Sequence, residues 1–139
     1  EVSGGHNETV LVVEDEEVVR SFVCDVLNDS GYDVLEAESG VEAIKLVEDE
    51  NTSIDLLITD VIMPKMNGRE LSQRLAKSRP DLKVLFMSGY TDNVIGDHGV
   101  LGEGMNFIQK PFTMQTFTQK VRSVIDGSQK GLEPTMNDD

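Results

Sequence analysis

Acidic, hydroxyl and basic side chains follow four short apolar segments of this sequence, each at the carboxyl end of its segment. Glu14 and Asp15 come directly after residues 9–13, and Asp60 comes directly after residues 54–59. Ser88 follows residues 82–87, and Lys110 follows residues 106–109. If these segments are neighbouring parallel strands, all five side chains meet at one edge of a sheet. A metal ion, an ammonium group and a hydroxyl around one carboxylate would stabilise a bound phosphoryl group.

Three carboxylates converging at that edge would repel one another unless a cation lies between them. Mg²⁺ or Mn²⁺ fits oxygen ligands better than zinc, which prefers nitrogen and sulfur. A purely structural explanation exists for each residue taken singly, because acidic residues stabilise helix amino-termini and Ser-Gly or Lys-Pro pairs form turns. The joint placement of all five at the same ends of four strands favours a site.

The elements that must position these residues alternate between strands and helices. After Thr9, residues 10–13 are wholly apolar, as is typical of a strand buried on both faces of a parallel sheet. The predicted strands are residues 9–13, 33–36, 54–59, 82–87 and 106–109. The predicted helices are residues 16–28, one opened by Ser39, one from Asn67 to about Lys77, a short or mobile one within 91–104, and one from Thr113 to Gly127. This alternation predicts an α/β, flavodoxin-like, doubly wound five-stranded parallel sheet of order 2-1-3-4-5 with five helices.

Size and composition set the domain organisation. The 139 residues suffice for one domain, predicted over residues 9–127. Residues 1–8 are expected to be a linker and residues 128–139 a flexible tail, because both lack apolar periodicity.

The charge balance excludes several classes of function. Twelve Lys and Arg against 26 Asp and Glu give a net charge of −14, which disfavours nucleic-acid binding and direct contact with an anionic membrane. The apolar runs are too short to span a bilayer. The single cysteine, Cys24, excludes an intramolecular disulfide and a cysteine-built zinc site, and favours a cytoplasmic location.

Four strings of this sequence, VLVVEDE, DLLITDVIMPKMNG, VLFMSGY and FIQKPF, resemble in that order the receiver domain of response regulators in two-component phosphorelays. The resemblance covers about residues 9–127. The sequence around SGYTDN, together with the glycine-rich stretch before MNFIQKPFT, is most similar to receivers fused behind the kinase core of hybrid sensor histidine kinases. A start without Met is expected for a segment of a longer kinase, which could be anchored in a membrane.

The resemblance implies a role for each site residue. Asp60 would be the phosphoacceptor, taking a phosphoryl group from a phosphohistidine. Asp15, Asp60 and the backbone carbonyl of Ile62 would hold Mg²⁺, with Glu14 contributing directly or through a water. Lys110 would bind a phosphoryl oxygen, and the Lys110–Pro111 bond is expected to be cis.

Further residues are implied to control switching and phosphate lifetime. Ser88 would bind a second phosphoryl oxygen and draw its loop inward, which opens space for Phe107; a core role explains Phe107 equally well. Ile62 and Tyr90 would shield the acyl phosphate from water. Self-dephosphorylation is therefore expected to be slow.

The partners implied are a histidine kinase core or a histidine phosphotransfer protein. A homodimer through the face formed by residues 91–104, 106–109 and 113–127 is a further alternative. Two other classes remain open: a receiver-like interaction module that is not phosphorylated, and a small Mg²⁺-dependent aspartyl phosphatase or phosphotransferase. The latter would need a general-acid Asp two residues after its nucleophile, where this sequence has Ile62.

Overall fold

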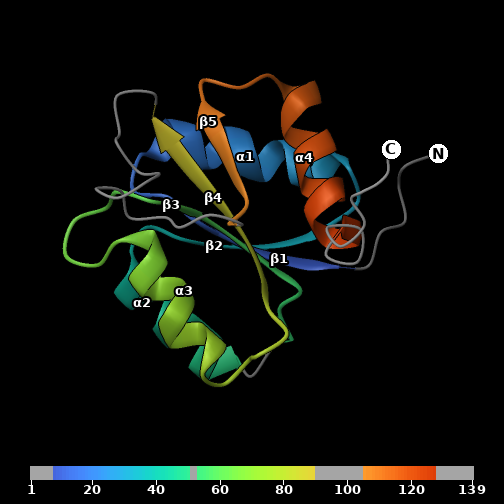
Figure 1. Cartoon of the computed structure of the whole chain (residues 1–139). Coiled ribbons are helices and arrows are strands. Elements are labelled where there is room, and N and C mark those ends of the chain that lie inside the picture. Colours follow the sequence, from blue (N-terminus) through green and yellow to red (C-terminus); the bar gives the residue numbers. More distant parts are fainter. Residues whose placement is uncertain (1–7, 51–52, 90–104, 128–139) are drawn as a thin grey trace.

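The computed structural model describes residues 8–50, 53–89 and 105–127. Helices and strands alternate along these residues (Figure 1). In chain order they are β1 (Thr9–Val13), α1 (Glu17–Asp29), β2 (Asp33–Ala37), α2 (Gly40–Glu50), β3 (Leu56–Asp60), α3 (Gly68–Ala76), β4 (Lys83–Gly89), β5 (Phe107–Lys110) and α4 (Met114–Gly127). The helix expected within residues 91–104 lies outside the described residues.

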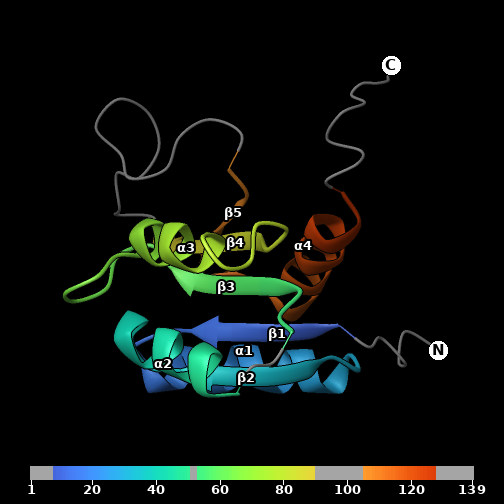
Figure 2. The same ribbon diagram turned by 90° about the horizontal axis from the view of Figure 1, so that it is seen from below.

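The five strands form one parallel sheet in the order β2-β1-β3-β4-β5, as predicted. Their register aligns the carboxyl ends, since Val13 lies opposite Thr59 and Gly89 lies opposite Lys110. The arrowheads of β1 and β3 accordingly point to the same side of the molecule in Figure 2. Side chains at the ends of these strands are therefore brought to one edge.

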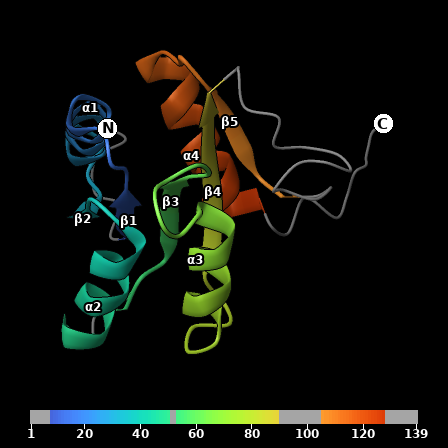
Figure 3. The ribbon, with the colours of Figure 1, turned by 90° about the vertical axis from the view of Figure 1, so that its left-hand side faces the viewer.

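Among the described residues, two helices cover each face of the sheet. The pair α1 and α4 lies on one face and the pair α2 and α3 on the other (Figures 1 and 3). Successive residues of β1 alternate between the two cores, with Val10 and Val12 packed toward α1 and α4, and Leu11 and Val13 toward α2 and α3. Burial on both sides explains why the strand has no polar alternation.

Side-chain caps begin three helices where the sequence predicts them. Asn67 accepts a hydrogen bond from the Glu70 N–H at 2.8 Å, and Thr113 Oγ1 accepts one from the Thr116 N–H at 3.0 Å. Ser39 Oγ accepts from the Glu42 N–H at 3.1 Å, while the carboxylate of Glu42 accepts from the N–H of Glu38 at 2.7 Å. The reciprocal bond of this capping box thus lies one residue earlier than in the usual pattern.

The apolar residues of α1 are buried only in part. Val23, Val26 and Leu27 are buried, but Val18 is 82% exposed and Phe22 is 40% exposed. Pairs of adjacent apolar residues cover a wider arc of the helix than the sheet does, so the outermost members face solvent. Phe22 packs instead beside the ring of Phe112, with centroids 6.3 Å apart.

The last helix packs one apolar stripe against the sheet, and a glycine follows the first helix. Val121 and its neighbours on the inner stripe of α4 are buried, and Gly31, just beyond α1, has a positive φ of 97°. Cys24 is buried, which raises the pKa of its thiol to about 11. Along the described ranges, no helix combines the length and the apolar character that a membrane crossing requires.

Candidate functional site

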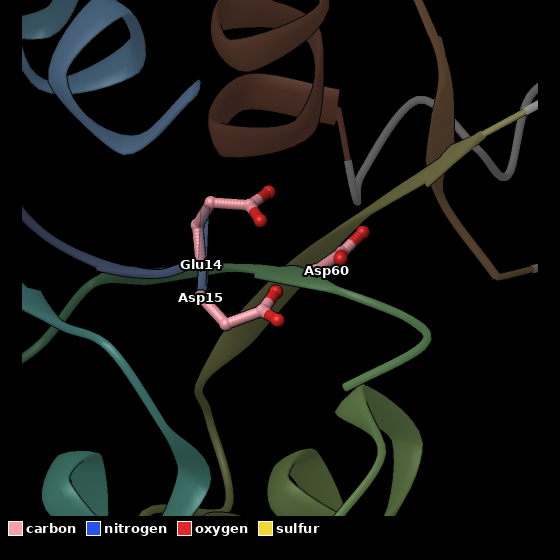
Figure 4. A group of neighbouring side chains, drawn as sticks. All are labelled: Glu14, Asp15 and Asp60. Atoms are coloured by element: carbon pink, nitrogen blue, oxygen red, sulfur yellow. The ribbon is translucent and has the colours of Figure 1, made fainter. Parts of the chain in front are cut away.

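Three carboxyl groups meet at the carboxyl edge of the sheet. Glu14 and Asp15 follow β1 and Asp60 is the last residue of β3, so the sheet register brings them together (Figure 4). Each offers an oxygen atom within 4.8 Å of the others. Glu14 is fully buried and Asp60 is 7% exposed, whereas Asp15 is exposed to solvent. The cluster is therefore open to water on the side of Asp15.

Lys110, the last residue of β5, lies against the two buried carboxylates. Its Nζ atom is 3.0 Å from Glu14 Oε1 and 3.1 Å from Asp60 Oδ1. The exposed carboxylate of Glu16 lies 3.9 Å away. The following peptide bond, Lys110–Pro111, is cis as predicted. One ammonium group thus faces several carboxylates.

The surroundings of this pocket favour the protonated, uncharged forms of Asp60 and Glu14. Burial, together with the charge of Glu14, raises the pKa of Asp60 to about 7 despite the nearby ammonium of Lys110. Burial also raises the pKa of Glu14, although the N–H of Glu16 and Lys110 oppose this shift. Burial alone would lower the pKa of Lys110, but its hydrogen bond to Glu14 and the charge of Asp60 outweigh it, so this pKa is raised.

These carboxyl groups are a suitable donor set for a hard divalent cation. Oxygen ligands from three acidic side chains, one of them open to solvent, match the preference of Mg²⁺ or Mn²⁺ for carboxylates and retained waters. Three carboxyl groups against the single ammonium of Lys110 leave an excess of negative charge when all three are ionised. The residues present therefore fit the cation that the sequence predicts.

Arg20 on α1 fixes the segment that carries the acidic pair. Its Nη1 donates to the carbonyl oxygen of Glu14 at 2.8 Å, and its Nε donates to Glu36 Oε1 on β2 at 3.0 Å. The sequence analysis did not single out this arginine. Its position, one helical turn beyond the acidic pair, is the signal that could have indicated it.

The loop after β3 turns back sharply onto the strand. The N–H of Val61 donates to the Met87 carbonyl at 2.9 Å, which continues the β3–β4 pairing. A tight turn centred on Lys65, with φ 72°, is closed by the Met66 N–H bonding to the Pro64 carbonyl at 2.7 Å.

Side chains of this loop alternate between the core and solvent. Val61, Met63 and Met66 are buried, and the side chain of Ile62 is 50% exposed. The methionines therefore serve core packing. Ile62 is left at the solvent-facing side of the loop, directly beyond Asp60 and Val61 in the chain.

Gly68 allows α3 to begin against the end of β3. A Cβ atom there would overlap the carbonyl oxygen of Asp60 and lie 3.0 Å from Thr59 Cγ2. The N–H of Gly68 also donates to the Val61 carbonyl at 2.8 Å. The sequence analysis missed this residue, although a glycine at the first position of a helix, just after its Asn cap, signals close backbone approach.

The structure describes two of the three remaining predicted residues. Ser88 is buried inside β4, opposite Gln109 and one residue before the partner of Lys110. This strand runs to Gly89, further than predicted. Phe107 is half-buried, lies opposite Phe86, and packs against the cluster of Val61 and Phe86. Tyr90 lies outside the described residues.

Two cavities differ in whether they border the site. One of about 660 Å³ lies at the opposite edge of the sheet, lined by Ile54, Pro80 and Asp126 among others, and contains none of the predicted site residues. A smaller cavity of about 200 Å³ adjoins the acidic cluster and is lined by Val19, Phe22, Lys110, Pro111 and Phe112. Of the predicted site residues, only Lys110 lines this smaller cavity, so it borders the site without containing the carboxylates.

Comparison with known proteins places this chain among signalling domains. The family model described as response regulator receiver domain matches residues 10–122. Sensor kinase CckA of Brucella abortus (strain 2308) is 36% identical over 118 residues, which cover 85% of this chain and 12% of the kinase. The chain thus spans about an eighth of that relative. Response regulator receiver protein CpdR of the same organism is 28% identical over 116 residues, covering 84% of this chain and 95% of CpdR.

A solved structure agrees with these matches. The crystal structure of the receiver domain from the hybrid histidine kinase CckA superimposes with a TM-score of 0.69 and 33% sequence identity. The alignment covers 84% of this chain and 98% of that domain.

Proposed function

This chain belongs to the response regulator receiver domain family of two-component systems, and on that premise we propose that its Asp60 accepts a phosphoryl group from a phosphohistidine of a partner protein. The observation that carries the proposal is the convergence of three carboxylates within 4.8 Å, with the Lys110 ammonium 3.1 Å from Asp60. The family resemblance and the strand order expected from the sequence are confirmed.

In the transfer, an oxygen of the Asp60 carboxylate attacks the phosphorus atom. A phosphorus–oxygen bond forms as the phosphorus–nitrogen bond breaks, and the leaving imidazole keeps the electron pair. Because the transition state for such transfers is loose, alignment and charge neutralisation matter more than a separate base. The buried, hydrogen-bonded surroundings of Asp60 supply the alignment.

The cation site consists of Asp15, Asp60 and the backbone carbonyl of Ile62, with Glu14 acting directly or through a water. Mg²⁺ is the proposed ion, and Mn²⁺ satisfies the same ligands. When bound, the cation stabilises ionised Asp60 and the negative charge on the phosphoryl oxygens. The exposure of Asp15 supports this assignment, because Mg²⁺ keeps several of its waters.

Three residues respond to the new phosphoryl group. Lys110 binds one of its oxygens, and the hydroxyl of Ser88 donates a hydrogen bond to another. The inward movement of Ser88 gives Phe107 room to turn inward. Because Phe107 has no hydroxyl, packing alone distinguishes its two positions. The contact of its cluster with buried Val61, next to Asp60, supports this coupling.

The partner is the core of a histidine kinase or a histidine phosphotransfer protein. Apolar side chains exposed on α1, in the loop after Asp60 and on α4 support docking of a partner around the site; they are Val18, Phe22, Ile62 and Met114. A homodimer through β5, α4 and residues 91–104 is the alternative partner surface.

The similarity to a sensor kinase supports a further assignment. We propose that residues 9–127 are the receiver segment of a hybrid histidine kinase, between a linker and a tail, and that it works in the cytoplasm even where the parent kinase is membrane-anchored.

Intact-mass measurement after incubation with acetyl phosphate, with and without Mg²⁺, tests the function. We expect a gain of one phosphoryl group that requires Mg²⁺ and is absent in Asp60→Asn. No gain with acetyl phosphate or with a phosphorylated kinase would indicate an interaction module that is not phosphorylated. Repeated turnover of small phosphate esters would indicate a phosphatase instead.

A further inference from the structure

The loop between β3 and α3 carries an exposed lysine. Residues 61–67 form this loop, and Figure 2 shows it, in green, extending beyond the end of β3. Met63 and Met66 are each 8% exposed and belong to the core on the side of α2 and α3, whereas Pro64 and Lys65 are exposed. Two buried methionines therefore hold the loop in place and leave the side chain of Lys65 outside the core.

The backbone of Lys65 has a conformation that lysine rarely adopts. Its φ is 72°, and the Met66 N–H donates to the Pro64 carbonyl at 2.7 Å, so these residues form a γ-turn with a positive φ at its centre. Such a turn is rare and strained, and the left-handed region favours glycine or asparagine over a long side chain. The stability of the fold alone would therefore favour glycine or asparagine at position 65.

The ammonium of Lys65 makes no polar contact that would explain a lysine here. Within residues 8–50, 53–89 and 105–127, its side chain forms neither an ion pair nor a hydrogen bond. Lys110, by contrast, contacts Glu14 and Asp60. A strained, exposed and unpaired cation directly after the phosphoacceptor strand is suited to an anion that another molecule brings.

We propose that Lys65 is a docking residue whose ammonium binds a carboxylate on the surface of the phosphohistidine-bearing partner. The inference rests on the proposed function, because the loop begins next to Asp60 and a donor must reach that residue. The protein has a net charge of −14, and exposed Asp15 and Glu16 lie at the same edge of the sheet. Acidic groups of a donor are repelled there unless a cation faces them, so Lys65 would select donors by local charge.

The proposed roles of the pocket leave Lys65 free for the surface of the partner. Lys110 and the divalent cation lie with the carboxylates and act on the phosphoryl group itself. Lys65 lies outside that pocket, in a loop fixed from below by Met63 and Met66. A carboxylate beside the phosphohistidine, rather than the phosphoryl group, is therefore the anion that we assign to it.

Phosphoryl transfer from two synthetic peptides tests this role. Each peptide carries one phosphohistidine, which is flanked by glutamates in the first and by glutamines in the second. Intact mass measures the rate of transfer to the unsubstituted protein, to Lys65→Asn and to the matched control Lys77→Asn. Asparagine removes the charge and suits a positive φ. Lys77 is likewise exposed and lies at the far end of α3 from this loop.

For Lys65→Asn, we expect the ratio of the acidic-peptide rate to the neutral-peptide rate to fall at least about threefold at low salt, the size of effect of an exposed charge pair. In about 0.5 M NaCl the fall should be less than about 1.5-fold, because salt screens exposed charges. Lys77→Asn should change the ratio by less than about 1.5-fold at either salt concentration. The melting temperature of Lys65→Asn should rise by about 2–4 °C as the turn loses its strain.

An unchanged ratio in Lys65→Asn, or an equal fall in Lys77→Asn, would overturn the inference. Equal slowing with acetyl phosphate would assign Lys65 to the phosphoryl group instead of the partner, and a lower melting temperature would assign it to the stability of the turn. Uptake from acetyl phosphate without transfer from either peptide would place recognition beyond the residues that flank the histidine, against the inference. Failure of the unsubstituted protein with all of these donors would instead overturn the proposed function.

Discussion

Asp60 occupies a pocket that disfavours its own charge. Burial and the neighbouring carboxylate of Glu14 raise the pKa of this group from 3.8 to about 7. In the unfolded chain the same carboxyl ionises near its ordinary pKa. Between these two values the folded protein binds more protons than the unfolded one, so this group lowers the stability of the fold as pH rises from about 4 to about 7.

We therefore predict that Asp60→Asn stabilises the metal-free protein. The gain in free energy of unfolding should be about 4 kcal/mol at pH 8, from about 1.4 kcal/mol for each unit between the two pKa values, and should vanish below about pH 3, where Asp60 is protonated in both states. Lys110 keeps Glu14 as its partner, so no buried charge is left alone. Urea unfolding across this pH range measures the effect. Asp15→Asn, at an exposed position, should change stability by less than about 0.5 kcal/mol; a destabilised Asp60→Asn would contradict the electrostatic description.

Ile62 is the described residue best placed to limit water at the acyl phosphate. Half of its side chain is exposed, two positions beyond Asp60. Ile62→Asn should shorten the lifetime of the phosphorylated protein severalfold, because a small polar side chain admits water. Loss of phosphate is followed by intact mass over time. The control Val41→Asn, exposed on α2, should leave the lifetime unchanged, and an equal lifetime in both variants would refute the shielding role.

The junction between β3 and α3 depends on a residue without a side chain. Gly68→Ala places a methyl group against the carbonyl oxygen of Asp60, which is backbone and cannot rotate away. We predict a loss of about 2–3 kcal/mol in free energy of unfolding and a slower phosphorylation of Asp60, since the strand end must shift.

Gly40→Ala at the start of α2 is the matched control. There the added methyl group meets the side chain of Met66, which can adjust, so the loss should be about 1 kcal/mol or less with normal phosphorylation. Equal losses in the two variants would show that helix propensity, and not the contact with Asp60, sets the cost.

The elements were largely predictable because their local signals agree with the tertiary structure. β1 and β3 consist mostly of apolar residues, and Asn67 and Thr113 cap helices as their sequence positions indicate. The alignment of the carboxyl ends then follows from parallel pairing, which places Asp60 and Lys110 at one edge. This is why the site residues could be grouped before the structure was known.

Contacts that depend on side-chain reach or on close backbone approach were not predictable. Nothing in the sequence states that Glu14 extends to Lys110, that Arg20 holds the Glu14 carbonyl, or that Gly68 lies against Asp60. The exposure of Val18 likewise depends on how much of α1 the sheet covers. Each of these is set by the distance between elements and not by the pattern within one element.

At the scale of the whole molecule, a net charge of −14 adds to the repulsion at the acidic edge. We predict that Mg²⁺ at about a hundred times its dissociation constant raises the melting temperature by about 10 °C, from roughly 2.7 kcal/mol of binding energy. NaCl at equal ionic strength should give a much smaller rise. Calorimetric melts measure both, and a Mg²⁺ effect that survives in Asp15→Asn would place the ion elsewhere.

If Asp60 itself accepts the phosphoryl group, the phosphorylated protein carries an acyl phosphate at this residue. Borohydride reduces an aspartyl phosphate to homoserine, so reduction of the phosphorylated protein followed by peptide mass spectrometry locates the modified residue. We predict homoserine at position 60 and at no other aspartate. Homoserine at position 15, the five-carbon hydroxy amino acid that a reduced glutamyl phosphate gives at position 14, or a phosphorylated protein that borohydride leaves unchanged would rule out Asp60 as the phosphoacceptor.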